Sequence, residues 1–192
     1  MKKILLISIF FLISALSTQA NEIKRIFVGN ESAKISIIAF ESLTCSHCAN
    51  FHKDVYPLLK KEYLDTGLAK IEFRHFPLDI AAFNASKVAQ CKNDGNLEIL
   101  ESLYANQQKW VKGSSIEEAN INLQKFLSKE GFNIDFESCI NNKQIEDFVL
   151  NDRIDGAKNF KVNATPTIII NNEKFEKSLN YKNLKKALEK LI

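Results

Sequence analysis

The residues best suited to chemistry are two cysteines separated by two positions, in the segment Cys45-Ser46-His47-Cys48. They follow an apolar run and begin a stretch in which apolar residues recur at helical spacing. A helix start directs free backbone N–H groups and the positive end of its dipole at the first sulfur, which stabilises a thiolate. Because the thiolate is the reactive form of cysteine, this arrangement predicts a redox pair. A structural disulfide or half of a zinc site are the alternatives for an isolated CxxC.

The elements around this pair predict a strand, a helix and a second strand. Residues 34–41 are rich in isoleucine, and residues 69–76 alternate between apolar and polar side chains, so both segments predict strands. Residues 45–63 have the spacing of a helix, with an expected kink at Pro57. A crossover of this length is typical of a βαβ unit with parallel strands.

The middle of the chain is helical almost throughout. We predict helices over 81–91, 97–110, 115–130, 136–141 and 144–160. Ser115 followed by Glu118 fits a capping box at the start of the third. About 65 to 80 residues of helix therefore interrupt the α/β pattern.

The last of these helices has an expected inward face of Ile145, Phe148, Val149 and Ile154. Beyond it the β pattern returns. An isoleucine-rich strand over 168–170 leads through an Asn-Asn turn to a partner strand that begins at Lys174. An amphipathic helix over 181–192 closes the chain.

Residues 1–20 have the pattern of a secretory signal peptide. Two lysines precede an apolar run over 4–16, and small residues lead to an expected cut after Ala20. The run is short of the about 20 residues that span a bilayer, so an uncleaved membrane anchor is the lesser alternative. We therefore expect export to the periplasm. Removing this segment leaves acidic and basic residues nearly balanced, with no Lys/Arg block, so nothing indicates nucleic-acid binding.

Export would place the four cysteines in oxidising surroundings. Four cysteines allow three pairings. If Cys45 and Cys48 pair with each other, Cys91 and Cys139 remain. A bridge between them would close a loop of about 49 residues, worth about 4 kcal/mol by chain entropy. We expect this structural disulfide, with two separate buried thiols as the alternative.

Thr165-Pro166, just before the late isoleucine-rich strand, completes a recognisable set with the CxxC pair and the helical insertion. The set resembles the thioredoxin fold, and its insertion resembles the DsbA-like branch, the exported thiol-disulfide oxidoreductases. The resemblance covers nearly all of the chain after the signal segment. It implies an α/β thioredoxin fold built from residues 21–79 and 161–192, with residues 80–160 as a helical insertion domain.

The resemblance also implies roles for the site residues. Cys45 would be the exposed nucleophile and Cys48 the more buried resolving partner. Ser46 and His47 would tune the thiolate, His47 through a positive charge or a hydrogen bond. The commoner residue at the position of Ser46 is proline, so the redox potential can differ here.

Other residues acquire expected roles in the same way. Thr165-Pro166 would form the cis-proline loop, whose exposed backbone pairs with a bound peptide as an added strand. Cys91 and Cys139 resemble a second cysteine pair of some relatives. A buried acid that some DsbA members carry in the first strand is replaced by Ala39, and the orientation of Glu41 is open.

Three residues outside these motifs receive structural assignments. His52 either packs or faces solvent, and His75 ends a strand. Trp110 is expected to pack within the helical insertion.

The activity implied is that of a dithiol oxidase that donates its disulfide to reduced, unfolded exported proteins. No cofactor and no metal are expected, and the protein would be a monomer. A quinone-linked membrane oxidase would reoxidise it. The alternatives are an isomerase or reductase of the same fold, and a metal-binding extracytoplasmic module, which the absence of a second CxxC disfavours.

Overall fold

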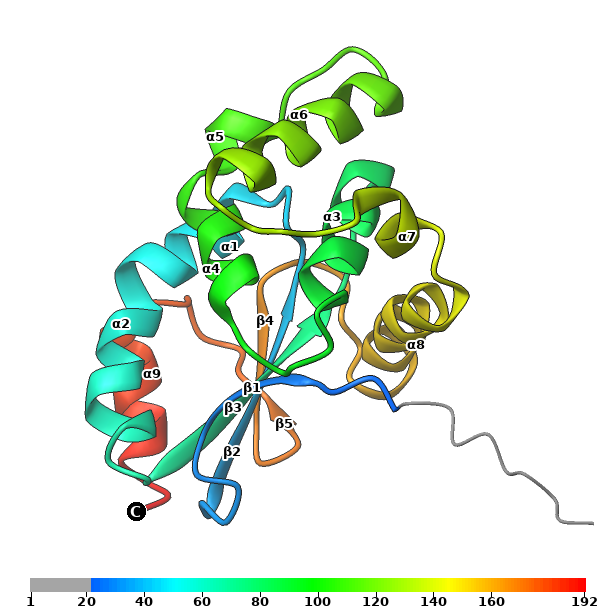
Figure 1. Cartoon of the computed structure of the whole chain (residues 1–192). Helices are drawn as coiled ribbons and strands as arrows, with labels where there is room; N and C mark the ends of the chain where they lie inside the picture. The colour runs from blue at the N-terminus through cyan, green and yellow to red at the C-terminus, as the bar shows by residue number, and fades with distance from the viewer. Residues whose placement is uncertain (1–21) are drawn as a thin grey trace, which may run out of the picture.

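The computed structural model describes residues 22–192, so the expected signal peptide at residues 1–20 lies outside the described part. A five-stranded mixed sheet stands at the centre of the molecule, in the order β1-β3-β2-β4-β5 (Figure 1). β2 and β3 run parallel, whereas the other neighbouring pairs are antiparallel. The strands are β1 (Ile26–Gly29), β2 (Ile35–Glu41), β3 (Ala69–His75), β4 (Thr167–Ile170) and β5 (Glu173–Lys174).

Burial explains the sequence patterns of the two parallel strands. β2 is buried on both faces, which is why it is a nearly continuous apolar run. β3 alternates between buried and half-buried residues, as its sequence predicts. β1 was not predicted, because four residues are too short for a periodic signal. This strand pairs with β3 through the register Ile26 to Phe73.

One continuous helical run follows β2 and passes through Pro57. It consists of α1 (Ser46–Asn50), a π-helical segment η1 (Phe51–Val55), α2 (Tyr56–Leu59) and a second π-helical segment η2 (Lys60–Leu64). Proline lacks an N–H and crowds the carbonyl four residues before it. The N–H of Tyr56 bonds to the carbonyl of Phe51, five residues back. The run therefore accommodates Pro57 with wider turns instead of ending there.

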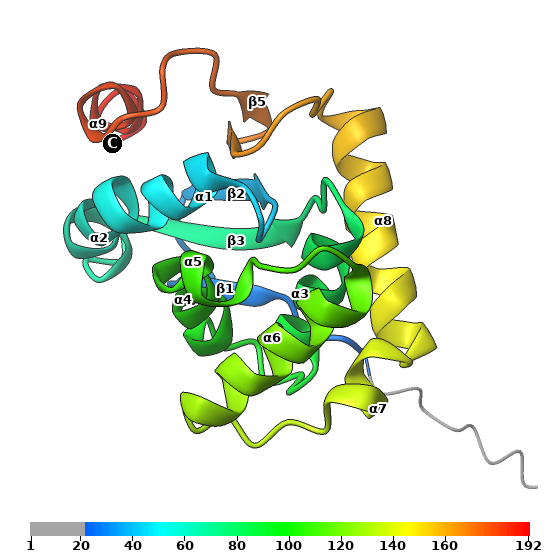
Figure 2. The ribbon, with the colours of Figure 1, turned by 90° about the horizontal axis from the view of Figure 1, so that it is seen from above.

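Six helices lie between β3 and β4 in the chain. Helices α3–α7 gather in one group away from the C-terminal helix, while α8 contacts β3 and α3 (Figure 2). The predicted helix 97–110 is divided at Asn106, whose backbone leaves the helical conformation. The six are α3 (Ile80–Gln90), α4 (Glu98–Ala105), α5 (Gln107–Trp110), α6 (Ile116–Lys129), α7 (Phe136–Ile140) and α8 (Lys143–Asn159).

The inward face of α8 differs from the predicted one. Ile145 and Val149 are buried, but Ile154 is 47% exposed, so its prediction was wrong. The buried positions that continue this face are Asp152 and Gly156. The Asp152 carboxylate accepts hydrogen bonds from the Arg25 guanidinium and from the backbone N–H of His75, which satisfies its charge. An added Cβ at Gly156 would come within 2.8 Å of the Phe40 ring, so close packing explains this glycine.

The final helix, α9 (Tyr181–Leu188), lies beside α2 (Figures 1 and 2). The predicted helix 181–192 ends early, at Leu188, after its buried face of Leu184 and Leu188 is complete. Lys185 and Glu62 join α9 to the first helical run with an ion pair of 2.7 Å. Among residues 22–192, no helix combines the length and the apolar character that a membrane crossing requires.

Candidate active site

The first cysteine of the CxxC pair stands at the start of the helical run. Cys45 is the N-cap residue of α1, in extended backbone conformation, and its carbonyl accepts the N–H groups of Cys48 (3.1 Å) and Ala49 (3.2 Å). Its sulfur is half-buried, whereas Cys48 is fully buried. Ser46 and His47 are exposed between them. Both cysteines are free thiols in this structure.

The surroundings of Cys45 favour its thiolate. Its pKa is lowered to about 5, chiefly by a hydrogen bond from the Cys48 thiol, although partial burial opposes the shift. The backbone N–H groups of Cys48 and His47 lower it further. The contribution of His47 to this shift thus comes from its backbone. Since Cys45 is both accessible and ionised at neutral pH, it has the properties of a nucleophile.

Cys48 has the opposite properties. Burial raises its pKa, and its hydrogen bond to Cys45 and the negative charge of Glu41 raise it further. A thiol that stays protonated can donate a hydrogen bond to the neighbouring thiolate, so the two shifts reinforce each other. The geometry therefore separates one attacking sulfur from one protonated sulfur.

Glu41 and His52 form a buried pair beside these sulfurs, which the sequence analysis did not foresee. His52 Nε2 lies 2.8 Å from Glu41 Oε2, and the imidazole stacks on Tyr104 with ring centroids 4.3 Å apart. His52 therefore packs in the interior. Ala39 is fully buried, and the strand has no acid at that position. The sequence does contain a signal for this pair. Glu41 is an acid at the end of an apolar strand, and a buried carboxylate requires a partner.

Thr165 and Pro166 come next to Cys45 from the far end of the chain. The peptide bond between them is cis, and the Thr165 carbonyl oxygen lies 3.3 Å from Cys45 Sγ. A groove of about 480 Å³ begins here and is lined on its apolar side by Pro166, Phe51 and Val55. The buried Thr165 backbone and the half-buried Pro166 thus lie together beside the reactive sulfur, at one end of this groove.

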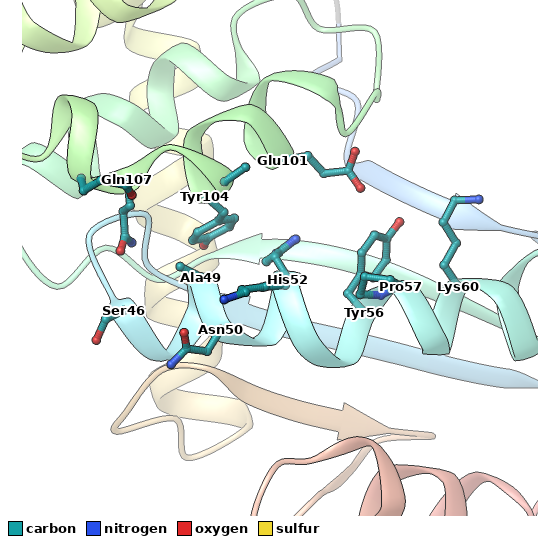
Figure 3. Close-up of a pocket in the computed structure, with 13 residues that line it drawn as sticks. Ser46, Ala49, Asn50, His52, Tyr56, Pro57, Lys60, Glu101, Tyr104 and Gln107 are labelled. Atoms are coloured by element: carbon teal, nitrogen blue, oxygen red, sulfur yellow. The ribbon is translucent and has the colours of Figure 1, made fainter.

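A second cavity, of about 670 Å³, lies on the other side of the helical run, between it and α4 and α5 (Figure 3). Ser46 and Gln107 line its end near the CxxC pair, and Glu101 and Lys60 line its far end. His52 also reaches this cavity. The helical insertion therefore forms one wall of a space that begins at the active-site cysteines.

Cys91 and Cys139 are joined in a disulfide, with Cα atoms 5.5 Å apart. Cys91 caps the C-terminus of α3, and Cys139 is buried in α7, so the bridge connects two helices of the insertion. Trp110 is buried in the same insertion and donates its indole N–H to the Leu103 carbonyl at 2.9 Å.

His75 is buried at the end of β3, where its Nε2 lies 3.3 Å from Gln90 Oε1. Burial lowers its pKa.

Within the described part of the chain, no three His, Cys, Asp or Glu side chains gather as metal ligands would.

The sheet, the helix-starting CxxC pair and the cis-proline loop define a thioredoxin-fold dithiol protein. A family model described as Thioredoxin matches residues 21–190. The chain belongs to this thioredoxin family, and its helical insertion gives it the DsbA-like form of the fold.

Solved structures and sequence relatives agree with this assignment. The crystal structure of Wolbachia pipientis alpha-DsbA1 superposes with a TM-score of 0.77, at 28% identity, over 87% of this chain and 90% of that one. BdbD from Bacillus subtilis shares the fold, with a TM-score of 0.71 at 22% identity over 87% and 92% of the two chains.

Among sequences, Disulfide bond formation protein D of Bacillus subtilis is 25% identical over 174 residues, which are 85% of this chain and 75% of the relative. Provisionally named protein-disulfide oxidoreductases of Rickettsia typhi and Rickettsia prowazekii are each 25% identical over 86% of this chain. The chain spans only 61% and 60% of their lengths.

Proposed function

We propose that this protein is a thiol-disulfide oxidoreductase that donates the Cys45–Cys48 disulfide to reduced, unfolded exported proteins. The observation that carries the proposal is the contrast between a half-exposed Cys45 with a pKa of about 5 and a buried Cys48 with a raised pKa. A low pKa makes Cys45 a good leaving group and stabilises the reduced enzyme, which makes its disulfide oxidising.

The reaction proceeds in two exchanges. A substrate thiolate attacks Cys45 Sγ, breaks the Cys45–Cys48 bond and forms a mixed disulfide, and Cys48 leaves and takes up a proton. A second substrate thiolate then attacks the substrate sulfur of the mixed disulfide and releases Cys45 as a thiolate. The substrate loses two electrons and the enzyme pair gains them. Cys48 can reverse the first step by attacking Cys45.

Substrate binding is assigned to the groove beside the cis-proline loop. The backbone of Thr165, which lines this groove, would pair with an extended peptide, and the apolar wall at Pro166 would accept side chains without reading a sequence. This mode suits unfolded chains. Ser46 and His47 are assigned the tuning of the thiolate, and the disulfide Cys91–Cys139 a structural role.

The same proposal covers the localisation, the domain organisation and the partners of the protein. Residues 1–20 would direct export to the periplasm, residues 21–79 and 161–192 would form the thioredoxin unit, and residues 80–160 its insertion. The protein would work as a monomer. Because each turnover consumes its disulfide, a membrane oxidase linked to quinones would reoxidise it.

The test is the redox equilibrium of Cys45–Cys48 with glutathione, measured on a chain with Cys91 and Cys139 replaced by serine, and on the unaltered chain by mass spectrometry of the trapped CxxC peptide. A potential of about −120 mV, with the reduced form more stable to denaturant, is the expected result. A potential of about −270 mV, with the oxidised form more stable, would contradict the oxidase and favour a reductase of the same fold.

A further inference from the structure

We propose that Gln107, in the helical insertion, is a positioning residue for disulfide exchange at Cys45. Its side-chain amide holds the backbone of the loop that presents the sulfur. The inference rests on the proposed function and adds to it a specific contact between the insertion and the CxxC pair.

The contact consists of two hydrogen bonds from one nitrogen. Gln107 Nε2 donates to the carbonyl oxygens of Leu43, at 2.7 Å, and of Cys45, at 3.0 Å. A primary amide has two N–H donors, so both are used on this loop. Figure 3 shows the side chain extending from the insertion toward the loop before Ser46.

The Cys45 carbonyl is the point at which the helical run begins. It also accepts the N–H groups of Cys48 and Ala49, and no side-chain cap holds this helix start. Gln107 therefore holds, from outside the helix, the residue at which the helical run begins. With the Cys45 backbone held, the N–H groups of His47 and Cys48 remain directed at its sulfur.

Gln107 is itself on a firmly packed element. It begins α5, which ends at the fully buried Trp110, and the Trp110 indole is bonded to the Leu103 carbonyl of α4. On the same two helices, Tyr104 stacks on His52 of the helical run. The insertion thus holds the active-site helix at its side through Tyr104 and at its start through Gln107.

The decisive variant is Gln107→Met, which keeps the length of the side chain but removes both donors. Its neighbour Gln108 lines the same cavity, is exposed and has no hydrogen bond to the Cys45 loop among the described residues, so Gln108→Met is the matched control. The readouts are the pH titration of the Cys45 thiolate absorbance and the equilibrium with glutathione, both on the full chain.

We expect Q107M to raise the Cys45 pKa by about one unit and to shift the glutathione equilibrium about tenfold toward the oxidised protein, while Q108M matches the unaltered chain. A loss of thermal stability in Q107M with an unchanged titration and equilibrium would show a merely structural contact and overturn the proposal. Equal shifts in both variants would overturn it too.

Gln107→Glu gives a second test that keeps the shape of the side chain. It replaces the donor by a carboxylate facing two carbonyls, and we expect a larger rise of the Cys45 pKa than in Q107M; an unchanged or lowered pKa would contradict the proposal. The difference between variants and unaltered chain is informative whichever potential the unaltered chain has. A reducing potential would therefore reject the oxidase without rejecting the role of Gln107.

Discussion

The two cysteine pairs of this chain occupy opposite ends of helices. Cys45 precedes α1 at its N-terminus, whereas Cys91 follows α3 at its C-terminus. Each pair joins a half-buried cysteine to a buried one, so exposure does not distinguish them. The helix dipole does, because its positive end stabilises a thiolate and its negative end opposes one. The comparison shows that the place of a cysteine on a helix, more than its burial, suits it for exchange or for a lasting bridge.

Partners reinforce this difference. Cys45 has the Cys48 thiol and the backbone N–H groups of Cys48 and His47 as donors to its sulfur. Cys139 reaches Cys91 from a helix 48 residues further along the chain. One pair is therefore local and rich in donors to a thiolate, and the other closes a long loop.

The largest expected effect is on the rate of thiol-disulfide exchange, which should depend on the CxxC pair and not on the Cys91–Cys139 bridge. Cys45→Ser removes the nucleophile, so oxidation of a reduced, unfolded protein should fall to the uncatalysed rate. The double variant Cys91→Ala with Cys139→Ala should keep the catalysed rate within about twofold, because distant sites act independently. A stopped assay of substrate thiols measures both. Loss of exchange in the alanine double variant, while it remains folded, would contradict the division of roles.

The two cysteine pairs should also differ in their effect on stability, and here the larger effect belongs to Cys91 and Cys139. Replacing Cys91 and Cys139 by alanine should lower the free energy of unfolding by about 4 kcal/mol, because the unfolded chain regains the freedom of a long loop. Denaturant unfolding under non-reducing conditions measures the change. A loss of less than about 1 kcal/mol would mean that the insertion does not depend on this bridge.

Of the two cysteine pairs, only the CxxC pair should make stability depend on pH, because the bridged Cys91 and Cys139 do not titrate. The pKa of Cys45 is lowered to about 5 in the folded reduced protein, against about 8.5 for a free cysteine. A lowered folded-state pKa contributes stability that is complete above about pH 8.5 and is lost as pH falls through about 5. The reduced form should therefore gain stability over the oxidised form as pH rises through this window.

Unfolding of both redox forms at several pH values tests this prediction, with Cys45→Ser as the control that removes the titration. A difference between the forms that does not change with pH would contradict the lowered pKa of Cys45.

The smallest expected effect concerns His47. Its side chain is exposed, so solvent screens its charge, while its backbone N–H remains after substitution. His47→Leu should raise the Cys45 pKa by less than about one unit and shift the glutathione equilibrium by less than about tenfold. A shift beyond that would show that the imidazole, and not the backbone, provides most of the tuning.

Local sequence patterns were sufficient to predict many of the helices and strands of this molecule. Ser115 accepts the N–H of Glu118, as the sequence predicts for this helix start, because a cap depends on residues three positions apart. Prediction failed where distant segments decide the outcome. Ile154 is exposed although apolar, since α8 turns Asp152 and Gly156 inward to meet Arg25 and Phe40.

The sequence by itself determined the CxxC pair at a helix start, the α/β elements around it and the position of the helical insertion, because these follow from spacing within short segments. Only the tertiary structure decided what surrounds the sulfurs: the Thr165 backbone beside Cys45, Glu41 with His52, and Gln107 on the Cys45 carbonyl. These contacts join residues 11 to 120 positions apart, and no local period reports which distant side chain will reach a given atom.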